Sequence, residues 1–366
     1  MRHVFPLLAV LAVLGVSAGR GLAQDRPDIF PTKDLRGNRA AIEHVAFHPG
    51  GKLLASAGTE GHIKVWDLES GRVLREIYPR GRSVDARTSP SVLPRLRRVE
   101  SIAFSPDGKL IAEAAAERSL SASLRLWNPK NGEEIRMLAR DVPNLRCLVF
   151  SPDGKLIASN ARDPSKWGHQ ITLRDVESGK VVATLREDRL AATLLTYSTD
   201  GKLLASAGAR RIHIWDVAER KATQTIEAHE KAIQSISLSP NGRFLASGST
   251  DDTARIWKVA TGTLDRKIET EQQGVLAVAY NPAGTILATA GADRTIKLWN
   301  PDSGKLYVRL YGHLDKVQCL AFSPDGKMLA SGSRDKRIAL WDVEGIEGVE
   351  TEDEDDRDED DIWGGD

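Results

Sequence analysis

Hydrophobic and polar positions recur along this chain in one repeated pattern, and each copy predicts four short strands. In the last copy, residues 317–322 and 328–331 are apolar runs separated by a turn, and residues 337–341 form a third run that ends in a tryptophan. Residues 306–310, where apolar and polar side chains alternate, predict a more exposed outer strand. Short apolar runs bounded by turn residues are typical of buried strands, so the pattern predicts small four-stranded sheets.

The turn between the first two strands of a copy has the form Ser-Pro-Asp-Gly, as in residues 323–326. Proline presets φ at the second position of such a turn, and glycine accepts a positive φ at the fourth. The turn glycines are spaced 57, 46, 47, 41, 42 and 42 residues apart: Gly51, Gly108, Gly154, Gly201, Gly242, Gly284 and Gly326. The position that closes the third strand carries Trp66, Trp127, Arg174, Trp215, Trp257, Trp299 and Trp341. The chain therefore contains seven copies.

The period of these copies predicts the architecture. One unit of this size cannot bury its own apolar faces, so it must stack against its neighbours. A chain of 366 residues could otherwise form two ordinary domains, but a single repeating series indicates one ring.

Over residues 29–343 the spacing, the turn and the closing Trp-Asp together resemble the WD-repeat family. The resemblance implies an all-β fold, a seven-bladed β-propeller of four-stranded antiparallel blades. In this family the last blade is closed by a strand from the other end of the chain. Aligning Gly37 with Gly312 places residues 29–35 as that strand. The blades are expected near residues 37–77, 97–138, 141–185, 188–226, 228–268, 271–310 and 312–343 plus 29–35.

The resemblance also implies a hydrogen-bonded tetrad of His, Ser, Asp and Trp within a blade. Two repeats carry all four residues: His229, Ser247, Asp251 and Trp257 in the fifth, and His313, Ser331, Asp335 and Trp341 in the seventh. Other repeats replace members of the set, with Asn38 and Glu60 in the first, Arg174 in the third, Ala209 in the fourth and Glu271 at the His position of the sixth. The two histidines are expected to be structural and not catalytic.

Departures from the period fall in three neighbouring repeats. Fifteen extra residues separate the first two repeats, and the second and third repeats are longer between their second and third strands. In the propeller topology all three insertions open on the same rim, and loops on a rigid scaffold commonly carry binding sites. Arg and Trp are enriched at the energetic centres of interfaces. The hypothesis is a partner site made of Arg80, Arg82, Arg87, Arg95, Arg97, Arg98, Trp167 and His169. The alternative is a solvated arginine loop, with Trp167 packed against its own blade.

Composition adds a charge asymmetry to this picture. Apolar residues make up 41% and charged residues 28% of the chain, as in soluble globular proteins, and the net charge is zero. Residues 350–366 nevertheless contain eleven Asp or Glu and one Arg, which leaves a basic body and an acidic tail. The charge of the tail and its few apolar residues predict that it is disordered. Three roles are open for it: a solubilising segment, a short capture motif around Trp363, or a segment that docks on the arginine-rich loop.

The first 23 residues resemble a secretory signal peptide. Arg2 and His3 precede an apolar run from Val4 to Val16, and small residues allow cleavage after Ala23 or, less well, after Ala18. The alternative is an uncut anchor, although the run is short of the ~20 residues needed to span a bilayer. The expectation is an exported protein, periplasmic or extracellular, with no membrane span after cleavage.

The two cysteines, Cys147 and Cys319, hold equivalent positions in the third and seventh repeats. In a ring of seven these repeats lie nearly opposite each other, whereas a disulfide needs Cα atoms about 4.4–6.8 Å apart. Both thiols are therefore predicted to be free and buried.

No arrangement of catalytic residues is found. The chain lacks Cys-x-x-Cys, His-Glu-x-x-His and a phosphate-binding glycine loop, so no catalytic residue, cofactor or metal is predicted. The expected function is a non-catalytic, exported scaffold, a monomer that binds a protein or peptide, with an acidic partner as a candidate. The alternative is a propeller hydrolase or lactonase with a metal in the central channel. Nucleic-acid binding is disfavoured by export and by the lack of aromatics among the loop arginines.

Overall fold

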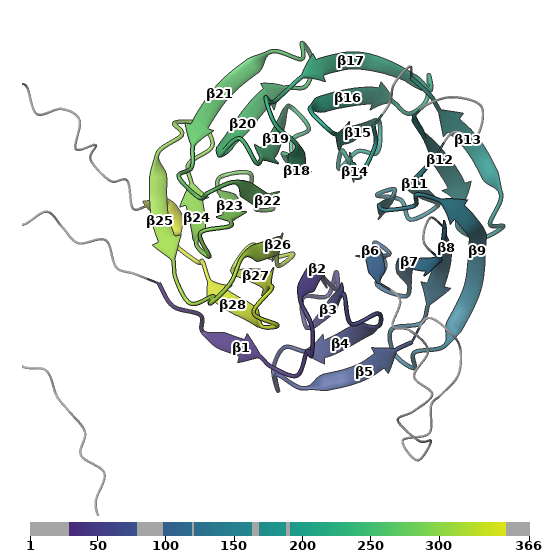
Figure 1. Ribbon diagram of the computed structural model, residues 1–366, viewed down its shortest axis with the longest axis horizontal. Coiled ribbons are helices and arrows are strands. Elements are labelled where there is room, and N and C mark those ends of the chain that lie inside the picture. Colours follow the sequence, from purple (N-terminus) through teal and green to yellow (C-terminus); the bar gives the residue numbers. More distant parts are fainter. Residues whose placement is uncertain (1–28, 79–97, 119–120, 163–167, 188–190, 349–366) are drawn as a thin grey trace, which may run out of the picture.

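The computed structural model describes residues 29–78, 98–118, 121–162, 168–187 and 191–348. These residues form seven four-stranded antiparallel sheets, arranged as blades around one axis (Figure 1). The predicted seven-bladed propeller is therefore confirmed. The expected signal peptide (1–23) and acidic tail (350–366) lie outside the described residues.

Each blade runs from an innermost strand at the axis to an outer strand on the circumference (Figure 1). The innermost strands are β2 (Ile42–Phe47), β6 (Val99–Phe104), β10 (Leu148–Phe150), β14 (Leu194–Tyr197), β18 (Ile233–Leu238), β22 (Val275–Tyr280) and β26 (Val317–Phe322). The second strands are β3 (Leu53–Gly58), β7 (Ile111–Arg118), β11 (Leu156–Arg162), β15 (Leu203–Gly208), β19 (Phe244–Ser249), β23 (Leu287–Gly291) and β27 (Met328–Ser333).

The third and outer strands complete the blades, which are numbered one to seven from β2 onward. The third strands are β4 (Ile63–Asp67), β8 (Ser121–Trp127), β12 (His169–Asp175), β16 (Arg211–Asp216), β20 (Thr253–Lys258), β24 (Ile296–Trp299) and β28 (Ile338–Asp342). The outer strands are β5 (Val73–Ile77), β9 (Glu134–Pro143), β13 (Val181–Leu185), β17 (Lys221–Glu227), β21 (Leu264–Glu269), β25 (Leu306–Leu310) and β1 (Lys33–Leu35). A 3-10 turn, η2 (Ile346–Gly348), follows the last strand.

The core lies between neighbouring blades. Trp66, Trp127, Trp215 and Trp341 are almost completely buried. Small residues of the second strands allow the next blade to approach closely. A Cβ atom at Gly332 would lie 2.5 Å from Ile42 of the next blade, and one at Gly248 would lie 2.5 Å from Val275. The recurring Leu-Ala-Ser-Gly pattern therefore reflects blade stacking as well as strand formation.

The N-terminal strand closes the ring, as predicted. Strand β1 pairs antiparallel with β28, with Lys33 opposite Leu340 and Leu35 opposite Ile338. The strand is shorter than the expected span of 29–35, because Pro31 has no N–H to donate to a ladder. Ile29 instead forms a parallel bridge with Leu310 of blade six, and its carbonyl accepts a hydrogen bond from the Tyr311 N–H at 3.0 Å. The leading segment thus contacts both blade six and blade seven.

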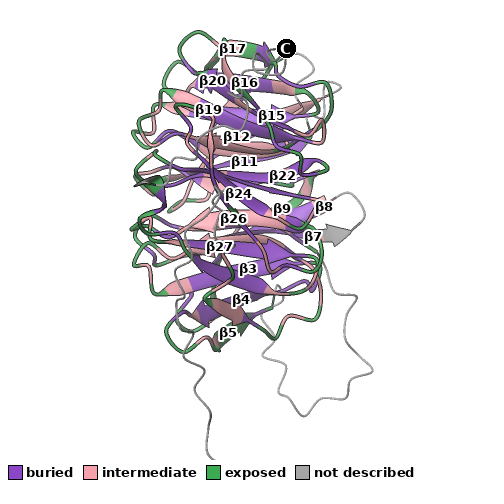
Figure 2. Ribbon diagram, turned by 90° about the vertical axis from the view of Figure 1, so that its left-hand side faces the viewer, coloured by how far each residue is buried: buried purple, intermediate pink, exposed green. Residues whose placement is uncertain are grey.

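The ring has two rims, which are seen edge-on in Figure 2. We call the rim where innermost strands begin and second strands end the insertion rim, and the opposite one the turn rim. All three enlarged connections start and end at the insertion rim. The connection 78–98 joins the end of β5 to the start of β6, and the pairs Arg118–Ser121 and Arg162–His169 mark the ends of the other two hairpins. In blade two, the extra residues lengthen strands β7 and β8.

The chain leaves the ring at the turn rim. Ile346 is buried against blade six, and the Glu347 carboxylate accepts a hydrogen bond from the Thr285 hydroxyl at 2.5 Å. Across the described ranges, no helix is long and apolar enough to cross a membrane.

Candidate functional site

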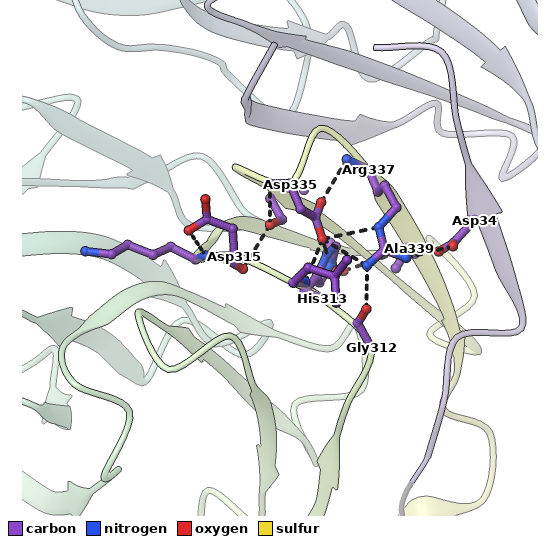
Figure 3. A network of polar contacts seen from close by, with 12 residues as sticks. Asp34, Gly312, His313, Asp315, Asp335, Arg337 and Ala339 are labelled. Carbon is purple, nitrogen blue, oxygen red and sulfur yellow. Dashed lines mark hydrogen bonds and ion pairs between the residues drawn. The ribbon is translucent and has the colours of Figure 1, made fainter. Parts of the chain in front are cut away.

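The structure brings the four tetrad residues of blade seven together, and Figure 3 shows two of them, His313 and Asp335. His313 Nδ1 lies 2.9 Å from the Asp335 carboxylate, and Nε2 lies 2.7 Å from the Ser331 hydroxyl. Because an ionised carboxylate only accepts, Nδ1 donates to Asp335; in the tautomer with its proton on Nδ1, Nε2 accepts from Ser331. The Trp341 indole in turn donates to Ser331 at 2.8 Å. Both ring nitrogens of His313 are therefore engaged, which leaves none for proton transfer to a substrate.

Blade five repeats this geometry. The distances are 2.9 Å from His229 to Asp251, 2.7 Å from His229 to Ser247 and 2.9 Å from Trp257 to Ser247. Burial acts to raise the pKa of Asp251, but hydrogen bonds from Thr253 and His229 outweigh it and lower that pKa to about 2. Burial also lowers the pKa of His229, so the imidazole is neutral at pH 7. The two tetrads tie the chain that enters each blade to its second strand.

A buried or half-buried cation supplements these ties, and sequence reasoning missed it. The Arg337 guanidinium donates to the Gly312 carbonyl at 2.5 Å and to Asp34 of the closing strand at 3.1 Å (Figure 3). The equivalent carbonyl accepts from a cation in three other blades: Lys64 to Gly37 at 2.6 Å, Arg255 to Ala228 at 2.8 Å and Lys297 to Thr270 at 2.6 Å. For three of the four cations the available signal was a Lys or Arg two residues before the closing Trp: Lys64, Arg255 and Lys297. Arg337 lies four residues before Trp341 and does not share this signal.

In blade six the predicted assignment of Glu271 to the His position is wrong by one residue. Gln272 occupies that position: its amide oxygen accepts from the Thr289 hydroxyl at 2.6 Å, and Thr289 accepts from the Trp299 indole at 2.9 Å. Glu271 is exposed and lies 3.7 Å from Lys297. Glu271 and Gln273 both have a positive φ, so the incoming chain makes an irregular turn that a fixed alignment cannot anticipate.

The first, second and fourth blades keep the bond from the closing tryptophan. Trp66 donates to Ser56 at 2.8 Å, and Trp215 donates to Ser206 at 2.9 Å. In blade two the acceptor is the carboxylate of the fully buried Glu113, at 2.9 Å from Trp127. The Glu60 carboxylate in blade one accepts from the Arg39 N–H at 3.0 Å, as Asp335 accepts from the Leu314 N–H in blade seven.

In blade three, residues of other types hold the chain that enters the blade. The buried Asn160 side chain accepts hydrogen bonds from the N–H groups of Arg146 at 2.8 Å and Cys147 at 3.0 Å, and donates to the Asn144 carbonyl at 2.9 Å. Arg174, in place of the closing Trp, donates to the Gly179 carbonyl at 2.8 Å. Its Nε atom is buried and has no hydrogen-bond partner among the described residues.

Of the eight residues predicted to bind a partner, two are described. Arg98 precedes β6 on the insertion rim, where its Nε donates to the Glu43 carboxylate of blade one at 2.8 Å. His169 begins β12, and its Nδ1 lies 2.9 Å from the Ala192 carbonyl of blade four. Burial lowers the pKa of His169, so it is neutral at pH 7. No contact joins these two side chains. Arg80, Arg82, Arg87, Arg95, Arg97 and Trp167 lie outside the described residues.

The described residues contain two cysteines, whose thiols are not paired with each other. Cys147 and Cys319 are free; Cys147 is buried and Cys319 half-buried. Burial raises the pKa of the Cys147 thiol to about 12 and also raises that of Cys319, so both stay protonated at pH 7. Within the part of the chain that the structure describes, no three His, Cys, Asp or Glu residues are grouped closely enough to hold a metal ion.

Comparison with known proteins agrees with this geometry. A family model described as "WD domain, G-beta repeat" matches residues 30–67, 95–128, 220–258, 260–300 and 304–342. Together these ranges cover just over half of the chain. The segment from about 129 to 219, which holds the asparagine-based blade three, is not matched.

Several curated proteins are similar to this chain. Nuclear distribution protein PAC1 of Arthroderma benhamiae is 29% identical over 222 residues, which cover 60% of this chain and 36% of that protein. A component of chromatin assembly factor 1 from Gallus gallus is 24% identical over 223 residues, covering 60% and 33%. Protein hir1 of Schizosaccharomyces pombe is 22% identical over 231 residues, covering 61% and 20%. The chain thus spans between a fifth and just over a third of the length of these relatives.

Proposed function

The chain belongs to the WD-repeat family, and from that premise we propose that it is a non-catalytic, exported scaffold that binds a protein or peptide through the insertion rim of blades one to three. One observation carries the proposal: every enlarged connection begins and ends on that rim, in three consecutive blades. The opposite rim keeps its regular turns. A rigid ring that varies only on one sector of one rim is typical of a binding scaffold.

The relatives support the general part of this proposal. One of them is named as a part of chromatin assembly factor 1, that is, as a component of an assembly. Fold alone does not assign a function, so the binding face must be tested directly.

The test is partner capture by the mature protein. In one variant, residues 79–97 are replaced by a Gly-Ser linker as short as the other blade connections, which leaves the described strands intact. We expect a partner that the unmodified protein retains to be lost by this variant. A matched control changes Lys155 and Lys202, on the turn rim, to Gln. Equal retention by all three proteins would refute the insertion rim as the binding face, provided that thermal unfolding shows each to be folded.

Export is a separate part of the proposal and rests on residues 1–23. Arg2 and His3, the apolar run from Val4 to Val16 and the small residues before position 24 support it. N-terminal sequencing of the protein recovered outside the cytoplasm should begin at Gln24. An intact N-terminus in a membrane fraction would instead indicate an uncut anchor.

A further inference from the structure

Alternating charges cross the insertion rim from blade seven to blade three. Arg98 Nε lies 2.8 Å from the Glu43 carboxylate of β2 and 3.9 Å from that of Glu100 in β6. Arg146, just before β10, places Nη1 at 3.9 Å from the same Glu100 oxygen. Burial raises the pKa of Glu43, while Arg98 and the more distant Arg334 of blade seven act to lower it. Arg98 and Arg146, from blades two and three, therefore pair with two glutamates, and Arg334 of blade seven acts on Glu43 from farther away.

The two charges of these pairs differ in exposure. The side chains of Arg98 and Arg146 are 49% and 53% exposed, whereas those of Glu43 and Glu100 are only 18% and 14% exposed. Arg334 is exposed as well. The carboxylates thus lie beneath the guanidinium groups, and one positive charge of the cluster is not balanced within it. Beyond these ion pairs, the described residues offer no acceptor to the remaining side-chain N–H groups of Arg98 and Arg146.

This arrangement is suited to carboxylates from outside. The planar guanidinium group presents a fork of donors that matches a carboxylate. The half-buried glutamates restrict the side chains of Arg98 and Arg146, so less side-chain entropy is lost when a ligand binds. Both arginines contact one oxygen of Glu100, so the contacting nitrogens are no farther apart than twice 3.9 Å. Residues two apart on an extended chain are spaced by about 6.6 Å, which fits within that limit.

We propose that Arg98, Arg146 and Arg334 form a docking surface for an acidic segment of a partner protein. Arg98 and Arg146 each take one carboxylate of two acidic residues that are two apart on an extended segment. Arg334 attracts the segment from blade seven. This inference rests on the proposed function and specifies its partner class. It adds Arg146 and Arg334, which lie outside the insertions, to the arginines predicted from the sequence.

The probe is a short fluorescent peptide of alternating glutamate and serine, with a glutamine–serine peptide as the neutral control. Binding to the full chain is measured by anisotropy at low and at physiological ionic strength. We expect Arg98→Gln and Arg146→Gln each to weaken binding about tenfold, since a bond to a charged group contributes roughly a factor of this size. Arg334→Gln should have a smaller effect, and added salt should weaken binding. Arg146→Lys should restore only part of the affinity, because it keeps the charge and loses the fork.

The matched control is Arg243→Gln, which removes an exposed arginine from the turn rim and should leave binding unchanged. Failure of the acidic peptide to bind, or equal affinities for Arg146→Gln and Arg243→Gln, would overturn the proposal. Competition by single-stranded oligothymidylate at equal charge would overturn it in favour of phosphate recognition. Suppose that the natural partner no longer binds when residues 79–97 are shortened but binds equally well to Arg146→Gln. The proposed docking surface would then be refuted, and the insertion rim would still be supported as the binding face.

Discussion

Blades five and seven hold their incoming chain with a histidine, whereas blade three holds it with an asparagine. In the first two, His229 and His313 link an aspartate to a serine that also receives the tryptophan bond. In blade three, Asn160 reaches from the second strand to two backbone N–H groups of the incoming chain. The requirement common to both is a buried polar group that satisfies this chain, and the residue type that supplies it can vary.

The same contrast divides the ring into two sectors. Blades five to seven keep a regular period and carry both complete tetrads. Blades one to three carry the enlarged connections, three of the five substituted tetrads and most of the charged cluster. In these blades other buried polar residues hold the incoming chain. The connections at the insertion rim can therefore differ in length while the four-stranded blade stays the same.

The largest effect is expected at the closure that joins the two sectors. Leu35 is fully buried between β28 and blade one, where it packs near Leu54 and Trp66. Leu35→Ala should lower the free energy of unfolding by about 3 kcal/mol, because a large apolar side chain leaves a cavity. Urea denaturation followed by tryptophan fluorescence measures this, and the transition should stay cooperative.

Phe30→Ala is the control for this closure, since Phe30 lies in the same segment but is 63% exposed. It should change stability by less than about 0.5 kcal/mol. Equal effects of the two substitutions would show that the leading segment does not close the ring through its buried side.

Removal of the asparagine tie tests blade three directly. Asn160→Ala leaves the N–H groups of Arg146 and Cys147 without their acceptor, so stability should fall by roughly 2–3 kcal/mol. Hydrogen exchange of these two amides should accelerate more than that of the equivalent amides in blade seven. Unchanged exchange at both amides would contradict the assignment of Asn160 as the tie.

The aspartates of the tetrads predict a pH dependence of stability that the asparagine tie of blade three does not provide, because the Asn160 amide does not titrate. Asp251 has a pKa of about 2 in the folded protein, below its ordinary value of 3.8. Its contribution to the free energy of unfolding is therefore fully present above pH 3.8 and is lost as the pH falls towards 2. Asp251→Asn should therefore cost on the order of 2 kcal/mol at pH 6, and much less near pH 2. Urea denaturation from pH 6 to pH 2 should show that the free energies of unfolding of the unmodified protein and of Asp251→Asn converge. A difference that stays constant would mean that the carboxylate charge does not stabilise the blade.

The smallest effect is expected when the missing tryptophan is restored. Arg174→Trp replaces a half-buried guanidinium, whose pKa is lowered by burial, with an indole that can donate to Ser159 as its equivalents do in other blades. We expect a gain of about 1 kcal/mol in stability. A loss of stability would show that blade three has repacked around the arginine, and Trp215→Arg in blade four gives the reverse comparison.

Much of the fold could be predicted because the signals are local. The glycine turns, the apolar runs and the closing Trp each lie within one repeat, and the count of seven follows from their spacing. The closing strand also followed from an alignment of Gly37 with Gly312, although β1 is limited to Lys33–Leu35. The substitute residues were harder to predict, because Gln272 and Asn160 act through irregular backbone turns or from neighbouring positions.

By itself the sequence determined the number of blades, the strands of each blade and the place where the enlarged connections open, since all three depend on a short periodic pattern. Only the tertiary structure decided which polar side chains meet between neighbouring blades. Glu43 lies in the first repeat, Arg98 and Glu100 in the second and Arg146 in the third, and stacking of the blades brings them within ion-pair distance. The physical reason is that backbone pairing within a blade follows local sequence, whereas contacts between blades depend on the assembled ring.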